Sequence, residues 1–280
     1  MKGMPSAHRP RPRVGLGLAA VREEPGAREH EVRAVGVGPW AGDLPVGRQW
    51  DAALLSGGDR RNVADRYRYW TQEAIVADLD SHRHAFHVAV ENWGHDFNIG
   101  SVVRTANAFN AKAIHIVGRR RWNRRGAMVT DRYQHEIHHP DVADLVRWTS
   151  RQVPGSAVGR IGGRPGDDGH GCPAGDGHGG PPGGGAGHGI PLIGVDNLPG
   201  SRPLETYDLP RECVLVLGQE GPGLSEPMLE ACAVVLDIAQ FGSTRSLNAG
   251  AAAAVAMHAW IRRHVFSQAP APVEGPKTRP

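Results

Sequence analysis

CVLVLGQEGPGLS, residues Cys213–Ser225, joins a short apolar run to a turn with three glycines within six residues. The run Cys213–Leu217 has the length of a buried strand, and residues that are apolar on both faces are typical of a parallel sheet. Gly218 begins the turn where the strand ends, and open α/β sheets bind ligands beyond the carboxyl ends of their strands. Glu220 projects from this turn, and the turn therefore predicts a ligand-binding site. The alternative is an ordinary β-turn in which Glu220 faces solvent.

The sequence on either side of this segment alternates between apolar runs and helical patterns. Strands are expected at 85–90, 113–117, 191–195 and 234–238, and helices at 98–109, 141–148, 224–233 and 246–264. Another helix is expected to begin at Asn62 or Thr71 and to end near His82. Strands that alternate with helices predict an α/β protein with a mostly parallel sheet.

Glycine and proline are concentrated in segments outside this pattern. The 280 residues include 38 Gly and 22 Pro, and they are enriched in residues 1–61 and 155–189. We expect a disordered leader at 1–61, a flexible Gly-rich insertion at 155–189 and a disordered tail at 267–280. These segments offer too few apolar residues to offset the entropy lost on ordering. An N-terminal helix within 62–84 and one folded domain at 85–266 remain.

Composition excludes several classes of protein. No stretch approaches about 18 apolar residues, so a transmembrane helix is not expected. Three cysteines make neither a disulfide framework nor a CxxC pair, which favours a reducing cytoplasm. The net charge is only +3, yet just three of the 32 basic residues are lysines. Arginine prefers bidentate contacts with phosphate, although high-GC codon usage is the simpler explanation for the total.

Two further stretches place polar residues beside expected strand ends. The first, Asn98–Ala106, carries Arg104 in a helix otherwise built for burial, so Arg104 either snorkels to the flank or faces an anion in a cleft. The second contains Ser246 and Asn248. Ser246 would serve simply as a helix N-cap, whereas Asn248 in the first turn is a poor helix former and suggests a ligand.

Together these three stretches resemble the SpoU/TrmH branch of the SPOUT RNA methyltransferases. Those proteins share an Asn followed by Arg-Thr-Ala, then Leu-Gly-x-Glu-x-x-Gly-Leu, then Ser-Leu-Asn. The corresponding residues here are Asn98 with Arg104–Ala106, then Leu217–Leu224, then Ser246–Asn248. The resemblance covers about residues 85–264 without the Gly-rich insertion.

The resemblance implies a sheet whose C-terminal part forms a trefoil knot, and a homodimer. It implies that S-adenosylmethionine binds to backbone groups near Gly218, Ile238 and Leu247. It also implies methyl transfer to a ribose 2′-hydroxyl of tRNA or rRNA without a metal. The polar site residues would be Asn98, Arg104, Glu220, Ser246 and Asn248. A relative that binds RNA and has lost catalysis is the alternative.

The chain departs from the family pattern beside the expected cofactor pocket. Ala239 and Gln240 follow Ile238 where the family usually has Pro and Met. Ala249 and Gly250 stand in place of a usual Val-Ser. These changes affect the wall of the pocket and therefore the affinity for the cofactor more than the chemistry.

Two other motifs carry chemistry. RRRWNRR, residues 119–125, sets five arginines around one tryptophan, which suits phosphate contact and base stacking; a solvated basic loop is the alternative. We expect RNA contacts from Arg119, Arg120, Arg121, Trp122, Arg124 and Arg125. His135–His139 reads HExxH, but a zinc site needs a helix and Pro140 disfavours one, so a polar loop or strand edge is expected.

Overall fold

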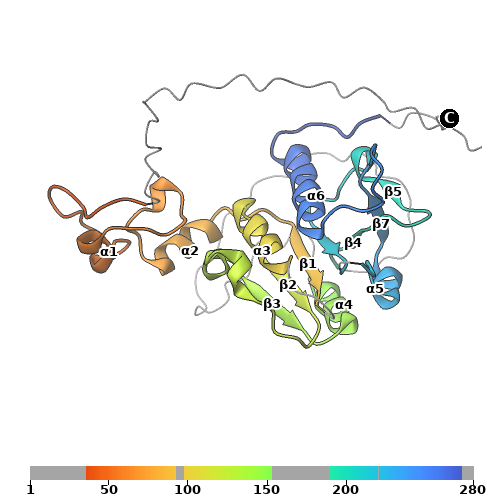
Figure 1. Ribbon diagram of the computed structural model, residues 1–280, viewed down its shortest axis with the longest axis horizontal. Helices are drawn as coiled ribbons and strands as arrows, with labels where there is room; N and C mark the ends of the chain where they lie inside the picture. Colours follow the sequence, from red (N-terminus) through yellow and green to blue (C-terminus); the bar gives the residue numbers. More distant parts are fainter. Residues whose placement is uncertain (1–35, 93–97, 153–188, 220, 273–280) are drawn as a thin grey trace, which may run out of the picture. The chain divides into compact units, whose positions relative to one another are not determined.

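A seven-stranded sheet, parallel throughout, forms the centre of the computed structural model, which describes residues 36–92, 98–152, 189–219 and 221–272. Figure 1 shows the strands side by side. From one edge to the other their order is β3 (Glu136–His139), β2 (Ile114–Val117), β1 (His87–Glu91), β6 (Val214–Leu217), β4 (Leu192–Val195), β7 (Val234–Asp237) and β5 (Arg202–Pro203).

The register of the central strands explains why they are apolar on both faces. Val88 of β1 lies opposite Ile114 on one side and Leu215 on the other. Alternate residues point to opposite faces of a strand, so Val88 and Val90 enter one core cluster and Ala89 enters a second. Helices cover both faces, as parallel sheets require.

Two pairs of helices form the outer layers (Figure 1). On one face α3 (Ile99–Ala108) and α6 (Ala249–His264) bury their apolar sides, and Trp260 of α6 packs on Phe86 with 4.6 Å between ring centroids. On the other face α4 (Val142–Ser150) and α5 (Glu226–Ala231) cover the second cluster. The predicted α/β class, parallel sheet and main helices are therefore confirmed.

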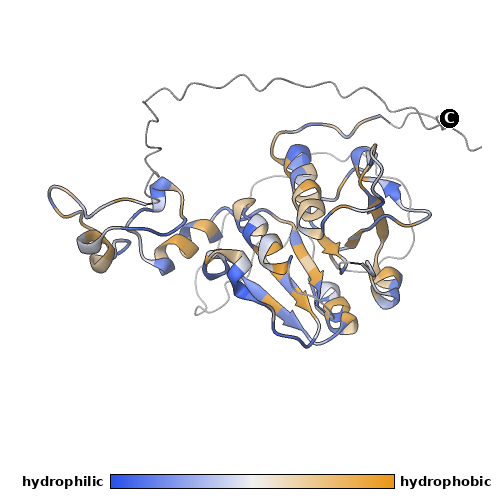
Figure 2. Ribbon diagram, viewed as in Figure 1, coloured by the Kyte–Doolittle hydropathy of each residue, from blue (hydrophilic) through white to orange (hydrophobic). Residues whose placement is uncertain are grey.

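Two strands were not predicted, because both are polar and lie at the edges of the sheet. β3 is more hydrophilic than β1 and β2 (Figure 2), and β5 has only two residues. The HExxH motif lies largely in β3, which agrees with the strand-edge interpretation. His135 bonds Asp80 and His139 bonds Asp144, so the two histidines have separate partners.

The prediction of a disordered leader over residues 1–61 is wrong for residues 36–61; residues 1–35 lie outside the described part. This segment carries α1 (Ala52–Gly57) and pairs with later residues at Val37–Asp59 and Trp50–Trp70. Asp59 is fully buried and accepts hydrogen bonds from the Arg61 guanidinium and from the backbone N–H of Tyr69. These contacts supply order that local hydropathy does not reveal.

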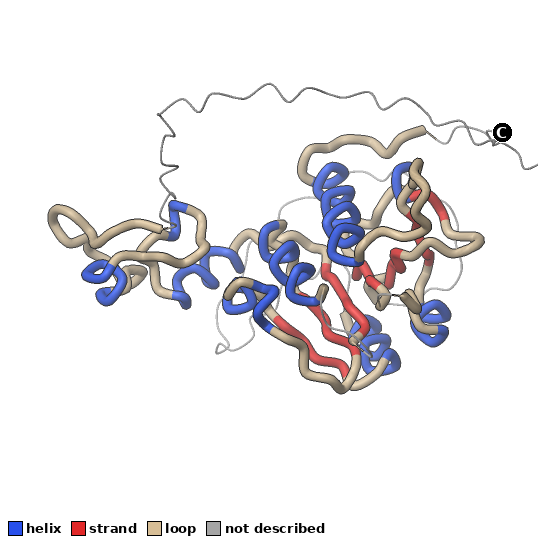
Figure 3. Tube along the Cα trace, in the orientation of Figure 1, coloured by secondary structure: helices blue, strands red, loops and turns tan. Residues whose placement is uncertain are grey.

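Of the two starts expected for the helix within residues 62–84, the one at Thr71 is confirmed, and the helix ends at Asp80, close to the expected end near His82. A 3-10 turn, η1 (Asp65–Tyr67), is followed by α2 (Gln72–Asp80), where the Thr71 hydroxyl caps the first turn. Figure 3 shows these short helices joined by long loops. Backbone hydrogen bonds from residues 50–70 take the place of the first helical turns, as in the bond from Asp51 N–H to Tyr69 C=O.

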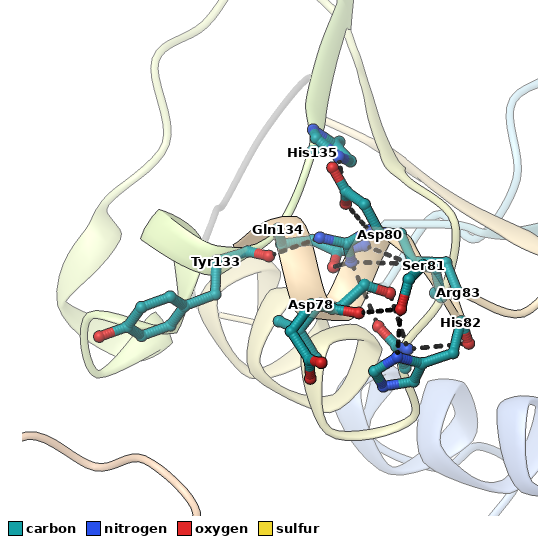
Figure 4. Close-up of polar contacts among 11 residues, drawn as sticks. Asp78, Asp80, Ser81, His82, Arg83, Tyr133, Gln134 and His135 are labelled. Carbon is teal, nitrogen blue, oxygen red and sulfur yellow. Dashed lines mark hydrogen bonds and ion pairs between the residues drawn. The ribbon is translucent and has the colours of Figure 1, made fainter. Parts of the chain in front are cut away.

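Arg83 ties the end of this N-terminal segment to the sheet (Figure 4). Its guanidinium donates to the Asp80 carboxylate, the Gln134 amide oxygen and the Tyr133 carbonyl at 2.6, 2.8 and 2.8 Å. His135 reaches the same Asp80 oxygen at 2.8 Å. The Arg83 side chain is only 5% exposed, so a single buried cation joins three segments.

The other two segments expected to be unstructured are only partly described. Residues 155–188 lie outside the described part, but Gly189 packs so closely on Thr149 that a Cβ would lie 2.6 Å from the Thr149 carbonyl oxygen. Of the expected tail, 267–272 is ordered, because Gln268 bonds Arg262 and Ala271 bonds Glu205. The predicted boundaries therefore need correction at both places.

Candidate functional site

A pocket of about 390 Å³ opens beyond the carboxyl ends of β4, β6 and β7. Gly218, Ile238 and Leu247, the residues expected to bind cofactor, all line it. So do Ser246 and Asn248 from the third motif. The remaining described lining residues are Val195, Asp196, Asn197, Leu217, Gln219, Gly221, Gly223, Gln240, Ala249 and Ala252. The second and third motifs therefore meet at one pocket.

The glycine turn forms one wall through its backbone. Gln219 and Gly223 exchange two backbone hydrogen bonds, and Gly221 and Gly223 have φ values of +91° and +76°. A Cβ on Gly218 would lie 2.3 Å from the carbonyl carbon of Gly223. Glycine is therefore required at these positions by conformation or by close approach. Glu220 lies outside the described residues.

Asp196 and Asn197 hold the two sides of the pocket together, and the sequence analysis missed both. The Asp196 carboxylate accepts from Leu224 N–H at 2.8 Å, which fixes the end of the glycine turn. The Asn197 amide donates to the Arg245 carbonyl at 2.7 Å, which fixes the loop before α6. Two polar residues directly after an apolar strand are the signal that could have revealed them.

Asn248 connects the third motif to the first. Its Oδ1 accepts from the N–H groups of Gly250 and Ala251, and its Nδ2 donates to Asn98 Oδ1 at 2.9 Å. Asn248, not Ser246, is thus the N-cap of α6, and the helix begins at Ala249 rather than near residue 246. An asparagine that the sequence placed inside a helix is explained by capping and by its bond to Asn98.

A smaller cavity beside the pocket contains Asn98 and Glu91 and shares Gly218 and Ala249 with it. Glu91 is only 4% exposed, and it accepts from the backbone N–H and the hydroxyl of Ser225 at 2.8 and 2.6 Å. This buried carboxylate fixes the start of α5 against the end of β1. A glutamate at the end of an otherwise apolar strand was a sequence signal that we did not use.

Arg104, which the sequence placed either on the flank of its helix or in a cleft, lies on the exposed side of α3. The side chain is exposed, and the described part of the structure shows no ion pair or hydrogen bond for it. The buried side of α3 consists of Ile99, Val102, Val103 and Ala106, and Arg104 lies off that side. The guanidinium is therefore available to an external anion.

Gln240 leaves a polar atom without a partner in the pocket wall. No described residue donates a hydrogen bond to its buried Oε1, and its Nε2 makes only a long contact of 3.5 Å with the Arg245 carbonyl. A buried acceptor without a donor costs free energy unless a ligand or a water satisfies it. The residue that departs from the family pattern thus leaves an acceptor open in the pocket wall.

The basic segment 119–125 divides into two kinds of residue. Trp122 is 7% exposed and belongs to the core, so its predicted role in base stacking is wrong. Arg124 pairs with Asp131 and Glu136 of the same chain at the surface, where its side chain is 57% exposed. The side chains of Arg119, Arg120, Arg121 and Arg125 are exposed. The tryptophan anchors the loop, and these four arginines face outward.

Two glycines bring this loop against α3. A Cβ on Gly100 would lie 2.5 Å from the Cα of Gly126, so the two backbones touch with no side chain between them. At the other end of the loop, the Asn92 amide donates to the Arg120 carbonyl at 2.7 Å. The basic loop is therefore fixed to the helix that carries Arg104.

A second group of buried polar residues crosses β1, β2 and β3 on the face covered by α4. His87 Nδ1 lies 2.9 Å from His115 Nε2, His115 Nδ1 lies 2.8 Å from His139 Nε2, and His139 Nδ1 lies 2.9 Å from Asp144. Trp148 packs on all three rings. Burial lowers the pKa of His87 to about 3 and lowers that of His115 well below its usual range.

Within the described residues, no three His, Cys, Asp or Glu side chains form a group that could hold a metal ion. No described helix has the length and apolar character needed to cross a bilayer. The two described cysteines, Cys213 and Cys232, are free thiols, and burial raises the pKa of each to about 12. Neither thiol is therefore suited to act as a nucleophile.

Comparison with known proteins gives matches of three kinds. The SpoU rRNA methylase family matches residues 186–258. An uncharacterised tRNA/rRNA methyltransferase of Mycolicibacterium smegmatis is 38% identical over 69 residues, which are 25% of this chain and 22% of that protein. The chain thus spans less than a quarter of this curated relative.

The solved structures that this chain is similar to include a TrmH/SpoU enzyme and a SpoU methyltransferase. The A. aeolicus TrmH/SpoU tRNA modifying enzyme has 14% identity and a TM-score of 0.51, and the match covers 70% of this chain and 84% of that one. The SpoU methyltransferase AviRb of Streptomyces viridochromogenes, solved in complex with AdoMet, has 20% identity and a TM-score of 0.49 over 67% of this chain and 61% of its own.

The first of these likenesses shows the fold, and the sequence match covers the glycine turn and the Ser246–Asn248 motif that line the pocket. The match ends at residue 258, inside α6. Over residues 186–258 the chain is therefore similar to the SpoU rRNA methylase family.

Proposed function

We propose that the chain is an S-adenosylmethionine-dependent RNA methyltransferase that methylates a ribose 2′-hydroxyl of tRNA or rRNA. The observation that carries this proposal is the meeting of three motifs, because Asn98 bonds Asn248, and Asn248 lines the same pocket as Gly218. The SpoU methyltransferase named above was crystallised with AdoMet, which supports the choice of cofactor.

The residues around the pocket fit a nucleoside joined to an amino acid. The backbone groups at Gly218, Ile238 and Leu247 suit the edge of an adenine, and a pocket of about 390 Å³ falls within the usual range for small ligands. The unpaired Oε1 of Gln240 would accept from an N–H group of the ligand. Nothing in this fit requires a metal, and we propose that none takes part.

The cofactor, when bound, supplies an electrophilic methyl group on a sulfonium. The reaction forms a bond from the ribose oxygen to the methyl carbon, breaks the bond from that carbon to sulfur and releases the hydroxyl proton. The chain must therefore align the partners and assist departure of the proton. We assign alignment to Asn98 and Asn248, which fix each other, with Ser246 and Glu220 as further polar groups of the site.

Arg104 would hold a phosphate of the RNA beside the reacting ribose. A guanidinium titrates too high to accept a proton in water, so it acts by binding and orienting the phosphate, which relays the proton. Its exposure and its lack of an internal partner support this role. Arg119, Arg120, Arg121 and Arg125 would extend the contact along the RNA backbone.

We further propose a trefoil knot in the C-terminal part, a homodimer and a cytoplasmic location. Light scattering of the full chain tests the dimer, and a monomer at working concentration would contradict it. A crystal structure with the cofactor tests the knot, because the chain from β7 to α6 must then pass through an earlier loop.

Three measurements test the activity. Calorimetry should show S-adenosylmethionine binding, and transfer of a labelled methyl group should appear in total RNA. Mass spectrometry of nucleosides from a deletion strain should show the loss of one 2′-O-methylated nucleoside. RNA binding without transfer would favour the inactive homologue, and no binding at millimolar cofactor would contradict the proposal.

A further inference from the structure

We propose that Asp196 makes the pocket selective for a cationic ligand, so that the methyl-bearing cofactor is favoured over its uncharged product. This inference rests on the proposed function, because it takes S-adenosylmethionine as the ligand. Asp196 lies outside all three family motifs, and the sequence analysis did not single it out.

The carboxylate of Asp196 is held in one orientation. Its Oδ2 accepts from Leu224 N–H and its Oδ1 from Asn197 N–H, both at 2.8 Å. A Cβ on Gly223 would lie 2.3 Å from Oδ2, so the glycine is what allows the carboxylate to sit against the turn. A charge fixed in this way stabilises a ligand without first having to reorganise.

This carboxylate is also uncompensated. Of the described residues that line the pocket, Asp196 alone has a formally charged side chain. It forms no ion pair within the described ranges, and the two groups that donate to it there are neutral backbone amides. Arg245, whose carbonyl binds Asn197, makes no ion pair with it. The negative charge therefore remains available to a ligand.

The two forms of the cofactor differ by one positive charge. S-adenosylmethionine carries a sulfonium, and transfer of its methyl group to the ribose oxygen leaves the neutral thioether S-adenosylhomocysteine while the hydroxyl proton departs. Attraction between unit charges several ångströms apart near a protein surface amounts to roughly a tenfold change in affinity. Transfer removes this attraction, which helps the product to leave.

The experiment compares S-adenosylmethionine, S-adenosylhomocysteine and sinefungin, whose amine is charged but is not a sulfonium, by calorimetry on the full chain. Asp196→Asn should weaken binding of both cations by about tenfold and change binding of the neutral thioether by less than about twofold. The control is Asp237→Asn, because Asp237 ends the neighbouring strand, accepts from Ser201 and does not line the pocket. It should leave all three affinities in their original ratio.

Equal weakening of the three ligands by Asp196→Asn would show that Asp196 only positions the glycine turn, and would overturn the inference. An equal shift in ratio from Asp237→Asn would do the same, since any nearby charge would then suffice. If Asp196→Asn does not fold, the wild-type chain decides: added salt should weaken the two cations more than the thioether, and a constant ratio contradicts the proposal. A wild-type chain that binds none of them refutes the proposed function instead.

Discussion

The histidine row and the pocket are both built from polar side chains, and they differ in whether those groups have partners. In the row, His115 has both ring nitrogens engaged and is fully buried. In the pocket, Gln240 keeps an unpaired acceptor and Asp196 keeps an uncompensated charge. The paired group stabilises the sheet, whereas the unpaired groups are available to bind a ligand. The presence of polar residues alone does not separate the two cases.

The largest expected effect tests the histidine row, in which the polar groups are paired. His115→Ala leaves His87 and His139 without their partner and opens a cavity beside Trp148. We expect a loss of about 3 to 4 kcal/mol in the free energy of unfolding, measured by denaturant titration. Affinity for S-adenosylmethionine in the protein that remains folded should not change. A weaker cofactor affinity would show that the row is coupled to the pocket.

The next effect tests Arg104, an exposed cation of the proposed site. Arg104→Ala should reduce methyl transfer at saturating RNA by at least about 100-fold, equivalent to about 2.7 kcal/mol, because the phosphate near the reacting ribose loses its cation. The melting temperature and cofactor affinity should remain unchanged, since the side chain is exposed and unpaired.

Two controls sharpen this prediction. Arg104→Lys should restore little activity, because lysine lacks the planar fork of arginine. Arg121→Ala in the basic loop should weaken RNA binding and its salt dependence while turnover at saturating RNA stays near wild type. Wild-type turnover in Arg104→Ala would remove Arg104 from the site.

A smaller effect concerns the pH dependence of stability, and it tests the histidine row again. Burial holds the pKa of His87 at about 3, whereas an unfolded histidine titrates near 6.5. Below pH 6.5 the unfolded state therefore takes up a proton that the native state does not, and stability falls as the pH falls. His87 alone should account for about 2 kcal/mol between pH 7 and pH 5.

Stability measured by urea titration across this range checks the slope. His87→Gln should flatten it, whereas His138→Gln, which changes a half-exposed histidine outside the row, should not. Equal slopes in wild type and His87→Gln would mean that His87 has the same pKa in both states.

The smallest expected effect concerns Asn248, which caps α6 and also lines the pocket. Asn248→Ala removes the N-cap of α6 and should cost about 1 kcal/mol of stability. Asn248→Ser keeps a capping oxygen but loses the amide that donates to Asn98. The serine variant should therefore melt close to wild type and still transfer methyl groups more slowly. If both variants lose only stability, the bond to Asn98 has no role in the reaction.

The sequence was sufficient for the central strands because each is apolar on both faces, and for the pocket because Gly218 and Leu247 belong to ordered motifs. It was not sufficient for the segment 36–61, where order comes from pairings such as Trp50 with Trp70 and from the burial of Asp59. Such contacts join residues far apart in the sequence, so no local periodicity predicts them.

The burial of individual side chains was the second feature that the sequence was not sufficient to predict. Trp122 in a run of arginines is as compatible with stacking on a base as with anchoring a loop, and only the neighbouring core decides between the two. For Arg104 the sequence left two placements open, and the structure shows that the apolar residues around it define one side of α3 and that the arginine lies off that side. A helical period locates the buried stripe, but the depth of each flanking residue depends on the packed partner.

The Arg83 contacts have a consequence for the order of folding during synthesis. Arg83 bonds Tyr133 and Gln134, which follow it by 50 and 51 residues, and the ribosome releases the chain from its N-terminus. The segment that ends at α2 must leave the exit tunnel well before its anchor exists. Until residues 110–111 emerge, that segment has only the contacts within itself, which include the Asp59–Arg61 pair. The final docking of α2 is thus timed by translation of β2 and of the loop that follows it.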